Sequence, residues 1–171
     1  MANAVFSDIN PDGKPPVAIS RGAIADVLQC KAHSAARVSV RFDRALCPFG
    51  YGLSYSTFDI GMPTLLATKI ATTGSVNVTV PIRNMSTRAG DETVQIQVRD
   101  TVSSVTRPIK ELKAFRRVIL AAGESRELTF TPEAFWMWSD KIKRVVELGD
   151  FEIMTGPDAV RLKSAMLTVV K

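Results

Sequence analysis

From residue 62 to the C-terminus, apolar and polar residues alternate along the chain in short runs. Each of four runs places its apolar residues on a single face. These sets are Val76, Val78, Val80 and Ile82 in the first run, Val94, Ile96 and Val98 in the second, Leu128 and Phe130 in the third, and Phe151 and Ile153 in the fourth. A period of two residues is typical of strands with one buried face. Turn-forming stretches such as "STRAGD", "AAGES" and "TGPDA" separate the runs, and no amphipathic helical pattern lies between them. The pattern therefore predicts an all-β domain over 62–171.

The number and spacing of these runs narrow the fold further. About seven short strands with turn signals between them are typical of an antiparallel β-sandwich of the immunoglobulin or fibronectin type III kind. We therefore predict two antiparallel sheets with their apolar faces packed together.

Residues 1–46 lack this alternation. The stretch "SDINPDGKPP" is a polar turn cluster with three prolines, and "RGAIADVLQCKAHSAARVSVRF" has only weak helical periodicity. A segment of this length cannot close a hydrophobic core by itself. It is predicted to be a partly irregular piece of a larger unit, either poorly ordered or packed loosely on the sandwich.

Between the two parts, residues 47–61 begin with "CPFGYGLSYSTF". Glycines allow tight backbone bends, proline stiffens the chain, and aromatic side chains with hydroxyl groups suit the seam between two domains. The stretch therefore predicts an interdomain hinge in which the aromatic rings pack between the domains; stacking on a sugar is the alternative. The predicted hinge residues are Pro48, Phe49, Gly50, Tyr51, Gly52 and Tyr55.

Composition and charge exclude several classes of function. The 171 residues are 46% hydrophobic and 23% charged, which is typical of one globular domain, or one domain plus a further piece. The net charge is +5, but the basic residues are scattered among acidic ones, so no nucleic-acid partner is predicted. No apolar run approaches the roughly 20 residues of a membrane span, so no membrane partner is predicted. The start of the chain lacks the features of a signal peptide, and the compartment stays unknown.

Several motifs in the same order resemble those of glycoside hydrolase family 3, the β-glucosidases and β-xylosidases. "SDINPDGKPP" resembles the family's G-D-x-N-P-x-G-K-L-P, and "CPFGYGLSYSTF" resembles Y-P-F-G-Y-G-L-S-Y-T-x-F. "RAGDETVQIQVRD", "RPIKELKAFRRVILAAGES" and "VVELGDFEIMTG" are similar to motifs that follow. The resemblance covers 2–20 and 43–170. It implies that 1–46 is the end of an α/β sandwich domain, and that the hinge joins this domain to a fibronectin type III-like domain.

The resemblance also implies which residues the chain lacks. In the family, an aspartate nucleophile and a glutamate general acid lie on domains upstream of the first motif. Retaining glycosidases need two carboxyl groups about 5 Å apart. Asp8, Asp43 and Asp59 lie in turns or in the hinge and match neither motif. We predict no catalytic residue and no activity for this chain alone, while the parent enzyme hydrolyses terminal β-D-glucosides or β-xylosides.

One stretch departs from the family pattern. Family members continue after the first motif with a segment like R-S-V-G-Q-x-P-x-Y-Y-N, where this chain has "RGAIADVLQCKAHSAARV". One choice among the allowed codons for 21–38, read one nucleotide later, gives V-G-Q-S-P-M-Y-Y-N-A-K-H-T-A-R-P-V. We interpret 21–38 as a frameshifted stretch, restored before "DRALCPFGYG".

The only cysteine and histidine side chains are Cys30, His33 and Cys47. They lack a C-x-x-C pair and a fourth ligand, so no metal site and no cofactor are predicted. A disulfide between the two cysteines is an alternative only in an oxidising compartment.

Three further residues invite a binding or modification hypothesis. Trp136 and Trp138 lie two apart in "FWMWSD", which predicts one strand face at the core edge or an interface; stacking on a sugar is the alternative. Asn84 begins the acceptor pattern Asn-Met-Ser for N-glycosylation, although an ordinary turn is the simpler interpretation.

The sequence leaves three hypotheses for function. The first is a structural, non-catalytic domain in a truncated piece of a family 3 enzyme, with the missing catalytic domains as its partner. The second is a free-standing module that binds carbohydrate or protein, and the third is a hydrolase that works in trans with a separate N-terminal half. Self-association through an exposed hinge seam is a further expectation.

Overall fold

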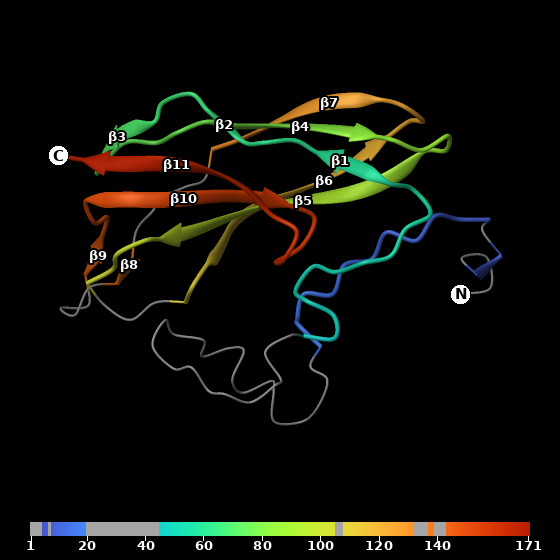
Figure 1. Cartoon of the computed structure of the whole chain (residues 1–171), viewed down its shortest axis with the longest axis horizontal. Helices are drawn as coiled ribbons and strands as arrows, with labels where there is room; N and C mark the ends of the chain where they lie inside the picture. Colours follow the sequence, from blue (N-terminus) through green and yellow to red (C-terminus); the bar gives the residue numbers. More distant parts are fainter. Residues whose placement is uncertain (1–4, 7, 20–44, 105–107, 132–136, 139–142) are drawn as a thin grey trace.

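Two β-sheets pack face to face in the computed structural model (Figure 1). The structure describes residues 5–6, 8–19, 45–104, 108–131, 137–138 and 143–171. The first sheet contains β1 (Phe58–Ile60), β2 (Thr64–Leu65), β4 (Val78–Asn84) and β7 (Ser125–Phe130). The second has the order β3 (Lys69–Ala71), β11 (Lys163–Val170), β10 (Gly149–Gly156), β5 (Gly90–Asp100) and β6 (Glu111–Leu120). A small ribbon joins β8 (Met137–Trp138) to β9 (Arg144–Val145).

The predicted all-β sandwich is confirmed, with more strands than the sequence indicated. All neighbouring strands are antiparallel except β3 and β11, which run parallel. β8 lies where a strand was expected from Trp136 and Trp138, whereas the additional strands β1, β2, β3 and β9 are two or three residues long. Such strands are too short to show a period of two. β1 lies within the stretch that the sequence assigned to the hinge, and it pairs with β4 over Phe58↔Asn84 to Ile60↔Ile82.

The core consists of the residues that the alternation placed on one face. All of the apolar positions named from the pattern are buried, and Leu167 and Val169 of β11 join them. Phe151 is the largest side chain in the fully buried set, and it is 1% exposed. Burial of these faces supplies the apolar driving force that holds the two sheets together.

β5 is buried on both faces in its middle, which the sequence did not predict. Gln95 and Gln97 point away from the core and are each only 3% exposed. The Nε2 atom of Gln97 donates a hydrogen bond to Oε1 of Gln95 at 3.0 Å. Glutamines that alternate with apolar residues along a strand predict that the outer face is in contact with solvent. The burial of Gln95 and Gln97 therefore indicates that other parts of the chain cover this sheet.

Pro81 lies inside β4, a strand with neighbours on both sides. Its carbonyl accepts a hydrogen bond from the Gly61 amide at 2.8 Å. The nitrogen of Pro81 therefore faces the same side, where β1 has ended at Ile60 and β2 has not begun. Because no strand pairs with β4 at that point, proline removes no ladder hydrogen bond.

Asn84 is fully buried at the end of β4. Its Nδ2 atom donates to the carbonyls of Arg88, Leu120 and Ala121 at 2.8, 3.3 and 3.0 Å. Its Oδ1 atom accepts a hydrogen bond from the Ser86 amide at 2.9 Å. A side-chain amide bonded in this way is closed to N-glycosylation, and it acts instead as a buried link between two turns.

No helix in the described part of the chain is long and apolar enough to cross a membrane.

Candidate functional site

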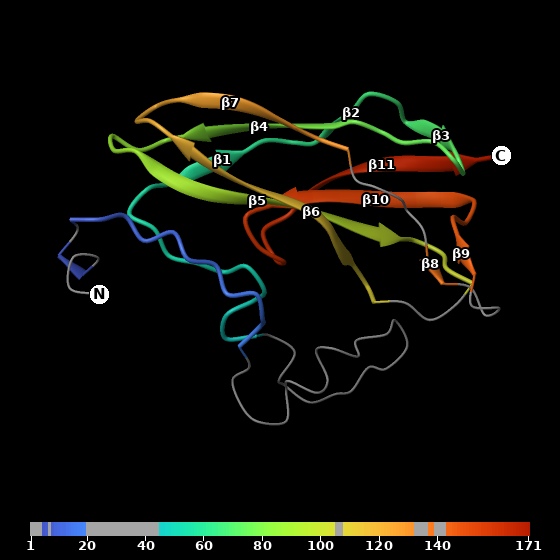
Figure 2. The same cartoon turned by 180° about the vertical axis from the view of Figure 1, so that it is seen from behind.

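Two segments from the N-terminal third lie side by side against the five-stranded sheet (Figure 2). The N-terminal segment is 8–19 and the hinge segment is 47–57. The amide of Ile19 donates to the carbonyl of Cys47 at 2.8 Å, and the Cys47 amide donates back at 3.2 Å. Further along, the Gly50 amide donates to the Pro15 carbonyl at 2.9 Å. The two segments and the sheet surface beneath them form the seam.

Asn10 joins three parts of the seam through its side chain. Its Oδ1 atom accepts hydrogen bonds from Ser54 Oγ at 2.9 Å and from the Tyr55 amide at 2.8 Å. Its Nδ2 atom donates to Ser56 Oγ at 2.8 Å and to the Ala89 carbonyl at 3.5 Å. One amide thus connects the N-terminal segment, the hinge segment and the turn before β5.

Charged residues attach the N-terminal segment to β5 and β6. Lys14 Nζ lies 2.7 Å from Glu92 Oε1, and the two side chains are 14% and 10% exposed. Arg117 bridges Asp91, at 2.6 Å, and Asp12 of the N-terminal segment. Removing one partner of a mostly buried ion pair lowers the stability of the folded chain, because the other charge is left buried without a partner. The Lys14–Glu92 pair therefore fixes the register of the segment on the sheet.

The hinge segment is attached to a loop at the other side of β5. The carbonyl of Phe49 accepts a hydrogen bond from the amide of Ala159, which lies in the loop 157–162 between β10 and β11. Lys110 Nζ donates to the Ala159 carbonyl. Burial lowers the pKa of Lys110, and the nearby charges of Asp158 and Glu152 partly oppose that effect. The loop is thus held from the hinge side and from the β6 side.

Asp158 stabilises this loop from inside. Its side chain is 1% exposed and accepts hydrogen bonds from the Val160 amide at 2.9 Å, the Arg161 amide at 2.8 Å and Arg161 Nε at 2.7 Å. Burial alone would raise the pKa of Asp158, but the hydrogen bonds from Arg161 and Val160 and the Arg161 charge outweigh it and lower the pKa. The ionised carboxylate is therefore the form that the folded loop prefers.

Replacing Asp158 by Asn is expected to make the loop less stable at neutral pH by about 1–2 kcal/mol, because an amide cannot accept all three bonds as well as a carboxylate does. A lowered pKa contributes stability that is present above the unfolded value of about 3.9 and is lost as the pH falls through the folded value. The difference between wild type and variant should therefore shrink below about pH 4. Urea unfolding at several pH values measures it, and a difference that grows towards acid would contradict the assignment.

The predicted hinge residues all lie in the seam. Gly50 is buried, with a φ of 75°, and a Cβ atom there would collide with Nε2 of Gln95. Tyr51 and Tyr55 lie beneath the guanidinium groups of Arg161 and Arg88, at 6.0 and 5.7 Å from the ring centroids. Pro48, Phe49 and Gly52 are partly buried. Their role between two domains remains a prediction.

A cavity of about 310 Å³ lies within the seam. Its walls come from the N-terminal segment, the hinge segment and the outer faces of β5 and β6, and they include Pro15, Phe49, Leu112 and Phe115. Large apolar side chains of the hinge segment and of β6 reach solvent: Leu53 is 73% exposed, Phe115, which lines the cavity, 68%, and Ile119 64%. The seam therefore combines a fixed polar base with an apolar rim.

Some candidate residues lie elsewhere. Asp59 is on the outer face of the other sheet, where Lys163 Nζ approaches it at 3.3 Å, and Asp8 is exposed. Trp138 contributes backbone to β8, but its side chain, with all of Trp136, lies outside the described residues. The stretch 21–38, which contains Cys30 and His33, also lies outside them, as does Asp43. In the part that the structure describes, no group of three or more His, Cys, Asp or Glu side chains could hold a metal ion.

The residues that hold the seam together were missed at the sequence level. Asn10 and Lys14 lie in the stretch that the sequence predicts to be a polar turn cluster, and nothing in the alternation of 92–98 singles out Glu92. The side-chain partners of Asn10 in the hinge segment lie 44 and 46 positions away along the chain, at Ser54 and Ser56, and Lys14 is 78 positions from Glu92. Local pattern carries no signal for such pairs.

Comparison with known proteins places this geometry in a family. Residues 92–159 match the family description "Fibronectin type III-like domain". A β-xylosidase from Formosa agariphila is 36% identical over 99% of this chain and 25% of its own length. A β-glucosidase structure from Erythrobacter marinus, at 36% identity, has a TM-score of 0.83 over 99% of this chain and 23% of that one. A glycoside hydrolase family 3 β-glucosidase from Bifidobacterium adolescentis, at 29% identity, has a TM-score of 0.79 over 98% of this chain and 27% of that one.

The chain is the C-terminal part of a glycoside hydrolase family 3 enzyme. It spans about a quarter of the length of the relatives that it matches. Its fibronectin type III-like sandwich is a non-catalytic domain of such enzymes, and the resemblance stated from the sequence motifs is confirmed.

Proposed function

We propose that this family 3 domain supports the catalytic part of a β-glucosidase or β-xylosidase through the seam. The observation that carries the proposal is the buried Lys14–Glu92 pair, which ties the N-terminal segment to the sheet. That segment precedes the sandwich in the sequence, so it is the connection to whatever lies upstream. Its attachment makes the sandwich and the segment 8–19 one base.

The apolar rim of the seam suits a protein partner. Leu53, Phe115 and Ile119 are large apolar side chains with more than three fifths of their surface exposed. Exposed large apolar side chains near charged groups favour a surface that another domain covers. In the chain alone, the same surface favours self-association.

The activity that the domain supports is hydrolysis of terminal β-D-glucosides or β-xylosides. This proposal follows the relatives that are named β-xylosidase and β-glucosidase. Such hydrolysis requires a pair of carboxyl groups on either side of the scissile bond. In the proposal these groups come from the catalytic part, and the sandwich contributes only their support.

A chimera tests the proposed support. The Erythrobacter marinus β-glucosidase would be made in three forms: intact, without its matching C-terminal part, and with this chain in place of that part. Turnover of an aryl β-glucoside is expected to be lost in the shortened form, because its seam partner is uncovered, and restored in the chimera by at least about tenfold, which corresponds to about 1.4 kcal/mol.

Full activity and thermal stability in the shortened form would contradict the proposal, since no support would then be needed. A folded chimera that is no more active than the shortened enzyme would also contradict it. Circular dichroism of each form distinguishes this result from a chimera that has not folded.

A further inference from the structure

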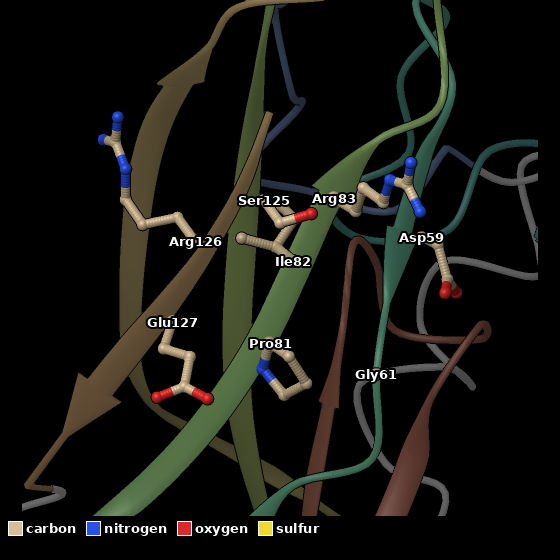
Figure 3. A pocket seen from close by; sticks show the side chains of 8 residues that line it. All are labelled: Asp59, Gly61, Pro81, Ile82, Arg83, Ser125, Arg126 and Glu127. Carbon is tan, nitrogen blue, oxygen red and sulfur yellow. The ribbon is translucent and has the colours of Figure 1, made fainter. Parts of the chain in front are cut away.

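A shallow groove lies on the outer face of the four-stranded sheet, on the side of the sandwich away from the seam (Figure 3). Its volume is about 270 Å³, and it is formed by β1, β4 and β7 together with the residue after β1. The groove is lined by Asp59, Gly61, Pro81, Ile82, Arg83, Ser125, Arg126 and Glu127. No residue of the seam contributes to it.

The groove exists because the strand beside Pro81 is interrupted at a glycine. Gly61 follows the last residue of β1 and donates its amide to the Pro81 carbonyl at 2.8 Å. A Cβ atom on Gly61 would lie 2.5 Å from Pro81 Cγ. The absence of a side chain there leaves the flat, exposed ring of Pro81 as an apolar floor.

Two side chains of opposite charge, Arg83 and Glu127, lie on either side of Pro81. Glu127 is paired with Pro81 across β7 and β4, and Arg83 lies two residues further along β4, between Asp59 and Ser125. Diagonal neighbours of this kind are about 7–8 Å apart. Figure 3 shows Arg83 extending toward β1 while Glu127 lies on the other side of Pro81.

The charged groups of Arg83 and Glu127 have no partner among the described residues. Within the described residues, no hydrogen bond, ion pair or ring contact involves the side chain of Arg83 or Glu127. The other charged groups of the lining have partners: Arg126 pairs with Glu124, and Asp59 with Lys163. One hydrogen-bond acceptor and one donor thus remain available around an apolar floor.

We propose that this groove binds one neutral, hydroxylated ring, as presented by a sugar unit of an oligosaccharide. The two carboxylates and two guanidinium groups of the lining cancel in charge, so neither an anion nor a cation is favoured. A pyranose ring has an apolar face that can lie on Pro81, and hydroxyl groups at its edge that can donate to Glu127 and accept from Arg83. The volume is just below the usual range of about 300–1,000 Å³ for ligand pockets, which fits a single ring with the rest of the ligand in solvent.

The test is a titration of the full chain, labelled with ¹⁵N, with cellobiose and with xylobiose as probes. Amide shifts are expected at Gly61, Arg83 and Glu127, with saturation in the millimolar range because the groove is shallow. Glu127→Gln and Arg83→Met should each weaken binding at least several-fold. Gly61→Ala should abolish the shifts, because its Cβ atom fills the space above Pro81.

Controls distinguish this site from other surfaces and other ligands. Glu152→Gln makes the same chemical change on the other sheet and should leave binding unchanged. Sodium sulfate at matched concentration should not reproduce the shifts; if it does, the groove binds ions and the proposal fails. Absence of shifts with both disaccharides, or shifts that persist in Glu127→Gln and Arg83→Met, would also overturn it. The result is independent of the chimera, since it concerns the opposite face of the sandwich.

Discussion

Replacing Asn84 by Ala is expected to lower the free energy of unfolding by about 3 kcal/mol, because several buried polar groups lose their partners at once. The Asn84 amide donates to the carbonyls of Arg88, Leu120 and Ala121, and its oxygen accepts from Ser86. Alanine leaves these carbonyls facing a small cavity at the end of the core. Urea unfolding followed by tryptophan fluorescence measures the loss.

Two further variants test whether the hydrogen bonds donated by the Asn84 side chain are responsible for the loss of stability. Asn84→Asp keeps the shape but presents carboxylate oxygen to the three carbonyls, and it should be at least as destabilising as alanine at neutral pH. Ser86→Ala keeps the amide from which Asn84 accepts but removes the hydroxyl that accepts a hydrogen bond from the Thr57 amide, so it should cost about 0.5–1.5 kcal/mol, clearly less than Asn84→Ala. An Asn84→Ala protein as stable as wild type would mean that the buried amide is not the link between the turns.

Replacing Gly50 by Ala is expected to lower the free energy of unfolding by about 3 kcal/mol, of which about 1–2 kcal/mol arises from the left-handed backbone. The remainder arises from close contact. A Cβ atom at Gly50 would collide with Gln95 Nε2 and would lie 3.4 Å from Asp158 Cα. The hinge segment would have to lift from β5, which breaks the hydrogen bond from the Gly50 amide to Pro15.

Gly123 provides a matched control for this variant. Its φ is 71°, close to the 75° of Gly50, but a Cβ atom on it would meet nothing within 4 Å. Gly123→Ala should therefore cost only the backbone part, about 1–2 kcal/mol. Equal losses in the two variants would show that the hinge segment does not press against the sheet as described.

The core of the sandwich could be predicted from the sequence because it depends on a local signal. Alternation at Val76 to Ile82 and at Val94 to Val98 decides which face is buried, and both predictions are confirmed. The hinge residues were singled out because glycine, proline and aromatic side chains have strong local preferences. Gly50 lies in the left-handed region, where glycine is favoured.

The remainder depends on contacts between distant parts of the chain. Gln95 and Gln97 follow the pattern of an exposed strand face, and they are buried because other segments of the chain cover them. Asn84 matched a glycosylation pattern, but turns from 88 and 120–121 enclose it. Neither result can be deduced from neighbouring residues, since the cause lies in the packing of segments far apart in sequence.

The rate of thermal inactivation of the chimera with Asn10→Ala tests most directly whether this domain supports the catalytic part through the seam. Asn10 connects the N-terminal segment, the hinge segment and the turn before β5, whereas Asn77 accepts one bond from Thr131 at the far end of the other sheet. We expect Asn10→Ala to shorten the half-life of aryl β-glucosidase activity several-fold, and Asn77→Ala to leave it unchanged. Equal half-lives for the Asn10→Ala, Asn77→Ala and unaltered chimeras would contradict the claim that this domain supports the catalytic part through the seam.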